Sequence, residues 1–339
     1  MIELFKMNAM KVYTCFNSIS VHGYSIQILK SGICKYCRRS NNDKLKWCIM
    51  EMALFNNHPK GKGLITNLIN RLKILLMEDI SFEEVDRIYN CIQLIDNYQL
   101  NRDNYNLLIE FCDILEYSKK NRLTSYVNCW WRNHSISINN NIAIDRSNKF
   151  YKKDDIFKLS ILCEHLIQYI ESSNEEMFGI FHELCKITDK CGIRYKRRKA
   201  VYLWFEVIET YITNDKIKAI FNFSLEMFHR KTMKERYAFG IWIGLYVYYN
   251  NRLNTTGNVY KHSIQYQDYY NNHNRIIIDD YVINDLHVNK SFTMENFARN
   301  GAFVENEDYS IMNNGEKYKQ YYITDKINAD KKTKCNKPR

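Results

Sequence analysis

The chain has 339 residues, of which 45% are hydrophobic, and this is enough for one large or two ordinary domains. Its two prolines and 11 glycines leave little to interrupt long helices, so the composition predicts an all-α fold. The formal net charge of +11 favours a polyanionic partner, nucleic acid above all, although a merely basic soluble protein would carry the same charge.

The sequence predicts a soluble, unsecreted protein with no membrane partner. No apolar run approaches the roughly 18 residues of a membrane span, and the opening MIELFKMNAMKVYTCF lacks a basic-then-apolar signal pattern. The 11 cysteines occur singly within helical patterns, which predicts buried thiols in a reducing intracellular compartment, cytoplasmic or nuclear. The abundance of Asn, Ile, Lys and Tyr is typical of an AT-rich genome such as that of a large DNA virus, which would add a viral replication site to these locations.

An acidic residue interrupts the apolar pattern of the first half of the chain. Residues 24–57 predict two short helices with a break near Ser40, and residues 64–80 predict a longer helix with one apolar stripe. Asp79 falls inside this stripe, and a buried carboxylate is costly unless it is hydrogen-bonded or paired. We therefore expect Asp79 to bond the first amides of the next helix or to pair with a cation. The stripe consists of Ile65, Leu68, Leu72, Leu75 and Leu76.

Further helices complete a first helical region over residues 1–135. Ser81 and Glu84 match a capping box, in which the serine takes a first-turn amide while the glutamate reaches back, so the next helix is expected to begin at Phe82. The apolar periodicity then predicts helices over residues 82–97, 104–118 and 123–133.

The second half of the chain is expected to hold a second helical region and a polar end. A polar linker over residues 136–153 precedes this region, which spans 154–252 and contains helices at 156–170, 177–187, 194–212, 216–230 and 234–249. Residues 253–325 are polar, Tyr-rich and weakly periodic, so they predict weak structure, and residues 326–339 form a basic, mobile tail.

One short segment carries the densest positive charge of the chain. Its sequence RYKRRK contains Arg194, Lys196, Arg197, Arg198 and Lys199 just before an aromatic helix. Cations at a helix start are destabilised by the helix dipole, so five of them in this position indicate a further role. We expect that role to be anion binding, and the alternative is a solvated helix end. Arg38 and Arg39 form a weaker second candidate for binding phosphates.

Cys34 and Cys37 have the CxxC spacing of metal and redox sites. No second pair of ligands follows them, and the βαβ context of a redox motif is missing. A structural role is therefore the main expectation, with a metal or redox role as the alternatives. No catalytic residue, metal site or cofactor is predicted, because the sequence contains neither a Walker A loop nor an H-E-x-x-H motif.

Two segments resemble known families. The sequences DKLKWCIMEMAL and NLINRLKILLMEDIS are similar to the C-terminal collar segment of the RarA/MgsA family, clamp-loader-like AAA+ ATPases that act at stalled replication forks. The family pattern has an Arg-rich entry, a helix with a central aromatic residue, and a helix ending in E-D-I-G. The matching positions are Arg38, Arg39, Trp47, Arg71, Leu72, Glu78, Asp79 and Ile80, with Ser81 in place of the usual glycine.

The second segment, IDDYVINDLHVNKSFTMENFARNGAFVENED, is similar to a pattern of collar-like proteins of large DNA viruses. Val288 and Asn300 depart from this pattern, and Asn284 looks like an insertion. The resemblance implies an all-helical collar that oligomerises, without the ATPase module that normally precedes it. The matching positions are Asp280, Tyr281, Asp285, His287, Phe297, Gly301 and Ala302.

These observations together predict a non-enzymatic, DNA-associated accessory protein of replication or repair that binds the nucleic-acid backbone without sequence specificity. Self-association or a replication protein would supply its protein contacts. The main alternative is a protein–protein scaffold or structural protein, for example of a virus, with no role in nucleic-acid binding. An enzyme acting on nucleic acid would need clustered ligands, for which Asp279, Asp280, Asp285 and His287 are the local candidates.

Overall fold

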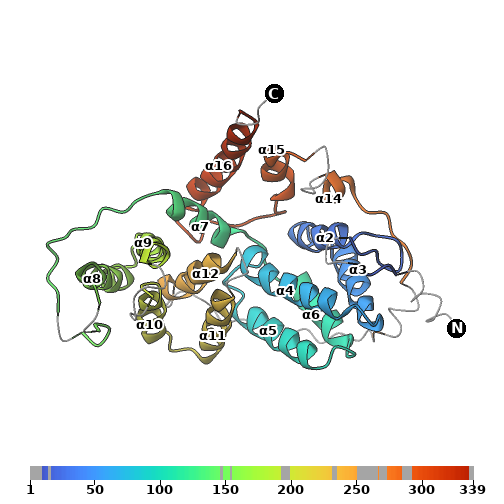
Figure 1. The fold of residues 1–339 in the computed structure, drawn as a ribbon, viewed down its shortest axis with the longest axis horizontal. Coiled ribbons are helices and arrows are strands. Elements are labelled where there is room, and N and C mark those ends of the chain that lie inside the picture. The colour runs from blue at the N-terminus through green and yellow to red at the C-terminus, as the bar shows by residue number, and fades with distance from the viewer. Residues whose placement is uncertain are drawn as a thin grey trace. The chain divides into compact units, whose positions relative to one another are not determined.

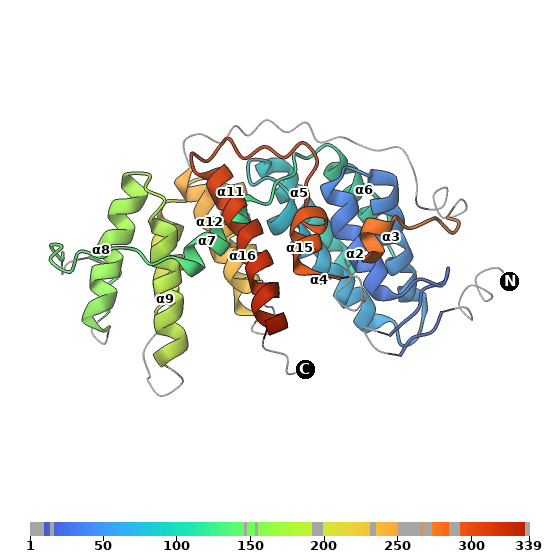
Figure 2. The ribbon, with the colours of Figure 1, turned by 90° about the horizontal axis from the view of Figure 1, so that it is seen from above.

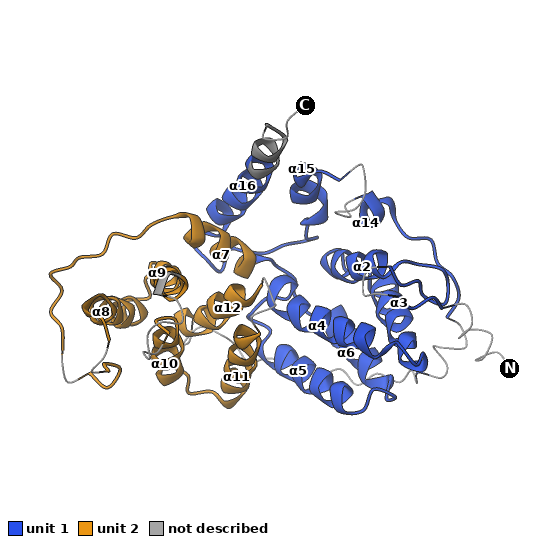
Figure 3. Cartoon of the chain, in the orientation of Figure 1, with its two compact units in different colours: residues 1–122, 256–339 blue, residues 123–255 orange. Residues whose placement is uncertain are grey.

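The structure, a computed structural model, describes residues 10–13, 17–145, 148–152, 155–191, 199–230, 235–249, 266, 273–284 and 292–335. The chain forms two compact units (Figure 3), and unit 1 combines residues 1–122 with residues 256–339 while unit 2 comprises residues 123–255. The predicted all-α fold is confirmed, since the only β-pairing among the described residues is three isolated bridges. None of the described helices is both long enough and apolar enough to cross a membrane.

Unit 1 is built around two helical hairpins, α2–α3 and α5–α6 (Figure 1). The long helix α4 packs against α2, α3 and α5 and so joins the hairpins. The elements are α2 (Ile26–Arg38), α3 (Asn42–Ala53), the 3₁₀ turn η1 (Leu54–Asn57), α4 (Lys62–Asp79), α5 (Val85–Leu100), α6 (Asn106–Glu116), α14 (Asp280–Asn284), α15 (Met294–Asn296), the π-helical turn η2 (Phe297–Gly301) and α16 (Gly315–Cys335).

The break predicted between the first two helices is confirmed. Helix α2 begins after Ser25, whose hydroxyl accepts the amide of Ile28. The chain then turns through Ser40, which has a left-handed φ of 51°, and the Asn41 side chain accepts the amide of Lys44 to start α3. The turn at Ser40 and the Asn41 cap therefore separate α2 from α3.

The capping box predicted at Ser81 and Glu84 is wrong. Helix α5 begins at Val85, and its first turn receives no side-chain cap from Glu84. The Ser81 hydroxyl instead donates to Glu83 and accepts from the Asn121 amide at 2.9 Å, while the Ser81 amide donates to the Lys119 carbonyl. Ser81 is held by the segment that follows α6, and that segment is distant in sequence.

The polar C-terminal region belongs to the first unit. We call residues 273–284 the strap, because its backbone carbonyls accept hydrogen bonds from α2 and α3 (Figures 1 and 2, where α14 lies beside α2). The Trp47 indole donates to Asn274 at 2.7 Å, and the Ser31 hydroxyl donates to Val282 at 3.0 Å. Most of the region predicted as separate, residues 253–325, therefore belongs to unit 1, which includes residues 256–339.

Unit 2 surrounds one central helix. Helix α12 is buried on all sides and packs against α7, α9, α10 and α11. Because α7 packs here, the boundary predicted at residue 135 lies instead at residue 122. The helix predicted from residue 194 begins at Tyr202. The elements are α7 (Leu123–Asn133), α8 (Phe157–Glu171), α9 (Met177–Cys191), α10 (Tyr202–Thr210), α11 (Asp215–His229) and α12 (Arg236–Tyr248).

Two glycines let aromatic rings reach the backbone of α12. A Cβ atom at Gly240 would lie 2.3 Å from the Phe181 ring, and one at Gly244 would lie 2.6 Å from the Trp204 ring. We expect Gly240→Ala to lower the free energy of unfolding of unit 2 by about 1–3 kcal/mol, because overpacking outweighs the helix propensity of alanine. Urea unfolding followed by circular dichroism would measure this loss.

Gly63 in α4 provides the matched control, because a Cβ atom there would meet nothing within 4 Å. Gly63→Ala should raise the free energy of unfolding of unit 1 by up to roughly 1 kcal/mol. Equal effects of the two substitutions would contradict the close packing at Gly240.

Candidate nucleic-acid interface

Arg38, one of the predicted phosphate contacts, lies inside unit 1. Its Nε donates to the Asp79 carboxylate at 2.7 Å, and another guanidinium nitrogen donates to the Gly301 carbonyl at 2.7 Å. The side chain is buried among these partners. The prediction that Arg38 binds nucleic acid is therefore wrong, because no surface presents its guanidinium to a phosphate.

Arg39, the next residue, also contacts the C-terminal part of unit 1. Its guanidinium stacks over the Tyr281 ring at 4.1 Å and over the Phe303 ring at 5.3 Å, and it donates to the Asn300 carbonyl. Arg39 therefore joins α2 to the residues around α14 and η2. The two resembling segments thus meet in unit 1, through Arg39 with Tyr281 and Arg38 with Gly301.

Asp79 is explained by a buried cluster of ions. Its carboxylate pairs with Arg38 and lies 3.5 Å from the Arg122 Nε, so the cation partner expected for Asp79 is present. The alternative, in which Asp79 caps a helix beginning at Phe82, is wrong because α5 begins at Val85. Glu78 lies 4.0 Å from Arg38 at the rim of this cluster, and burial raises its pKa.

The other predicted motif residues have structural or peripheral positions. Trp47 is buried against the strap, and the Arg71 guanidinium lies 3.7 Å from the Cys34 sulfur. Asp280 is exposed at the start of α14, and Asp279, a candidate for catalysis, pairs with Lys44 at 2.6 Å. Asp285 and His287 lie outside the described residues, as do Arg194, Lys196, Arg197 and Arg198.

Lys199, the last cation of the charged segment, is exposed at a cavity in unit 2. The cavity has a volume of about 70 Å³ and lies where the C-terminal part of α9, the start of α10, the end of α11 and the start of α12 meet. We call it the cationic pocket, and the residues that give it its character are Lys199, Tyr202, Phe228, His229, Arg236 and Tyr237.

Hydrogen bonds between elements hold the walls of the cationic pocket. The amide of Val201 donates to the Thr188 hydroxyl of α9 at 3.0 Å, which fixes the chain just after Lys199. The Tyr202 hydroxyl lies 3.1 Å from the His229 Nδ1, and this contact joins α10 to the last residue of α11. These two hydrogen bonds therefore fix the backbone next to Lys199 and the side chain of His229 in the wall of the pocket.

Aromatic side chains hold Arg236 at the cationic pocket. Its guanidinium donates to the Tyr237 hydroxyl at 2.7 Å and stacks over the rings of Tyr237 and Phe228. The Tyr237 hydroxyl in turn donates to Asp189 at 3.1 Å, and burial raises its pKa, so it remains a neutral donor. Within the described part of unit 2, no carboxylate lies at ion-pair distance from Arg236, and its charge is available to an anion.

Two cation-rich stretches of sequence contribute described residues to the cationic pocket, Lys199 from the first and Arg236 from the second. Residues 186–199 contain seven Lys and Arg against one acidic residue, and residues 229–237 contain four against one. Sequence reasoning singled out only the end of the first stretch. The second stretch was missed because it runs into the apolar pattern of α12, and a count of local charge would have found it.

A larger cavity in unit 1, of about 320 Å³, has a mainly acidic wall. Its wall carries two lysines, Lys119 and Lys120, against four acidic residues. This excess of negative charge disfavours phosphate binding. The acidic residues are Glu83, Glu116, Glu305 and Asp308.

The CxxC pair lies in the core of unit 1. Both thiols are buried, and burial raises the pKa of Cys34 and of Cys37. A protonated, buried thiol is a poor metal ligand and a poor nucleophile, which favours the structural role. Among the described residues, ligand atoms converge as a possible metal-binding group at His22, Glu51 and His273, and this group contains neither cysteine.

Comparison with known proteins gives no relative for this chain. No family model matches it, and neither a curated protein nor a solved structure matches it. A function for the protein therefore has to be argued from the residues and the geometry described above.

Proposed function

We propose that the protein is a non-enzymatic, DNA-associated accessory protein of replication or repair that binds the nucleic-acid backbone without sequence specificity. The observation that carries this proposal is the cationic pocket, in which Lys199, His229 and Arg236 face one small cavity. The collar-like segments of unit 1 would provide self-association or docking to a replication protein.

The size and chemistry of the cationic pocket suit one phosphate group. The cavity is small, with a volume of about 70 Å³, and two cationic side chains line it. The Arg236 guanidinium offers paired N–H donors to phosphate oxygens, and the Lys199 ammonium adds a point charge. Contacts of this kind position a backbone and do not distinguish bases.

Removing the two pocket cations should weaken DNA binding and its salt dependence. We expect a Lys199→Gln, Arg236→Gln double variant to bind two unrelated duplexes more weakly to the same extent. Its slope of log affinity against log salt should fall by about 2, since each lost phosphate contact removes about 0.9. Fluorescence anisotropy between about 50 and 200 mM salt would measure both quantities.

A second double variant, Lys152→Gln with Lys218→Gln, is the matched control. It removes the same charge from unit 2, but Lys152 already pairs with Glu206 at 3.0 Å and Lys218 with Glu209. Equal losses in the two double variants would assign binding to net charge alone. If wild type shows no affinity at low salt while light scattering finds a stable oligomer, the scaffold alternative is correct.

A further inference from the structure

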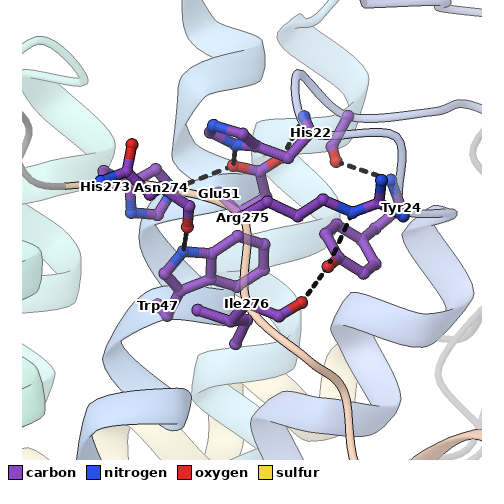
Figure 4. Close-up of polar contacts among 9 residues, drawn as sticks. His22, Tyr24, Trp47, Glu51, His273, Asn274, Arg275 and Ile276 are labelled. Atoms are coloured by element: carbon purple, nitrogen blue, oxygen red, sulfur yellow. Dashed lines mark hydrogen bonds and ion pairs between the residues drawn. The ribbon is translucent and has the colours of Figure 1, made fainter.

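Three segments that are distant in sequence bring metal-ligating atoms together in unit 1 (Figure 4). His22 lies in a loop beside the bridge between Ile19 and Ser25, Glu51 lies on α3, and His273 begins the strap. The His22 Nδ1 lies 2.8 Å and the His273 Nε2 lies 2.9 Å from the same Glu51 oxygen, Oε2. All three ligand atoms lie within 4.8 Å of one another.

The buried negative charge of Glu51 would be stabilised by a cation. Its side chain is 0% exposed, and its carboxylate accepts a hydrogen bond from the His22 amide and lies within hydrogen-bond distance of the His22 and His273 imidazoles. Its partners among the described residues include the His22 amide and the two imidazoles, and none of the described lysines or arginines pairs with it. A fully buried carboxylate without a cation is costly, and a bound divalent ion would supply the missing charge.

The donor set is one that transition metals use. Two imidazole nitrogens and one carboxylate oxygen bind zinc and non-haem iron(II) with positions left open for solvent or substrate. Bond lengths of about 2.0–2.1 Å at tetrahedral angles place such ligand atoms roughly 3.4 Å apart. The N–O separations of 2.8 and 2.9 Å would therefore widen by about half an ångström.

A surrounding layer of contacts orients the ligands. The His22 amide donates to Glu51 Oε1 at 2.9 Å, which leaves Oε2 directed between the two imidazoles. Trp47 stacks on the His273 ring at 5.0 Å and donates its indole N–H to Asn274, so the start of the strap is fixed. Supports of this kind hold metal ligands in one orientation.

We propose that His22, Glu51 and His273 bind one divalent first-row transition ion, which ties the strap to α3. His22 is 17% exposed, whereas His273 is 1% exposed, so the open coordination position faces the His22 side. The competing arrangement is a hydrogen-bonded triad in which both imidazoles donate to Glu51 and no metal binds. The proposal concerns unit 1 and does not depend on nucleic-acid binding.

Zinc and cobalt binding to the full chain tests the proposal. Chelator-treated protein should bind one Zn²⁺ per chain in a calorimetric titration, and its melting temperature should rise with added Zn²⁺. The Co²⁺ form should show visible d–d bands without thiolate charge-transfer bands, because the three ligands contain no sulfur. No stoichiometric binding, or charge-transfer bands from cysteine, would overturn the proposal.

Substitutions locate the ion. His22→Gln and Glu51→Gln should each weaken Zn²⁺ binding by about 100-fold or more, since loss of a mere supporting contact costs roughly 10–100-fold. His58→Gln, in the same unit, should bind like wild type. His22→Gln is the decisive variant because His22 is partly exposed, and far-ultraviolet circular dichroism would show that it folds. Equal affinity of the His22 and His58 variants would refute the site.

Discussion

Asp79→Asn should lower the free energy of unfolding of unit 1 by about 3–5 kcal/mol. The substitution keeps the shape of the side chain but removes the charge that faces Arg38 at 2.7 Å and Arg122 at 3.5 Å. Both guanidinium groups are buried and would lose this carboxylate, and Glu78, at 4.0 Å from Arg38, is too far to replace its hydrogen bond. Urea unfolding followed by circular dichroism, with the transitions of the two units fitted separately, would measure the loss.

An exposed ion pair in the same unit gives the control for this experiment. Glu295 pairs with Arg299 at 3.2 Å, but the two side chains are 50% and 62% exposed. Glu295→Gln should therefore change the stability of unit 1 by less than about 0.5 kcal/mol. A loss below about 1 kcal/mol for Asp79→Asn would show that the buried cluster is not what holds α2 to α4.

Acid should destabilise unit 2 through His182. This side chain is buried in α9, and its Nε2 has no hydrogen-bond partner among the described residues. Burial, aided by Arg132 and Lys186, lowers the pKa of His182 from 6.5 to about 3. Between these two values the unfolded chain takes up a proton that the folded chain does not, so stability is lost as the pH falls from 6.5 to 3. The loss amounts to about 4–5 kcal/mol.

Replacement of the imidazole isolates this effect. His182→Leu should abolish most of the fall in the free energy of unfolding of unit 2 between pH 6.5 and pH 4, because leucine has similar bulk and no proton to gain. His229→Gln removes an exposed imidazole from the same unit and should leave that fall in place. Parallel pH profiles for wild type and His182→Leu would contradict the assignment.

The sequence predicted the positions of the helices better than the assignment of segments to the two units. Apolar periodicity identifies α4, expected over 64–80 and found over Lys62–Asp79, because helix packing leaves a regular pattern in the sequence. The strap leaves no such pattern, since α2 and α3 donate to its backbone carbonyls, which any sequence possesses. Its place in unit 1 could not be read from residue types alone.

The sites show the same contrast. Asp79 could be singled out because a carboxylate in an apolar stripe violates local pattern, yet its partners Arg38 and Arg122 come from other parts of the chain. His22 and His273 lie 29 and 222 residues from Glu51, so no motif spacing connects them. A residue that departs from its local pattern can be found in a sequence. A site formed by residues distant in sequence can be found only once the fold is known.

The division of unit 1 into two stretches of sequence constrains how the chain matures on the ribosome. Residues 1–122 are synthesised first, but the carbonyls that satisfy Trp47 and Lys35 belong to a stretch made only after the whole of residues 123–255. Domains generally acquire their structure as units during translation. All of residues 123–255 therefore leave the ribosome before residues 1–122 can make their contacts with the strap.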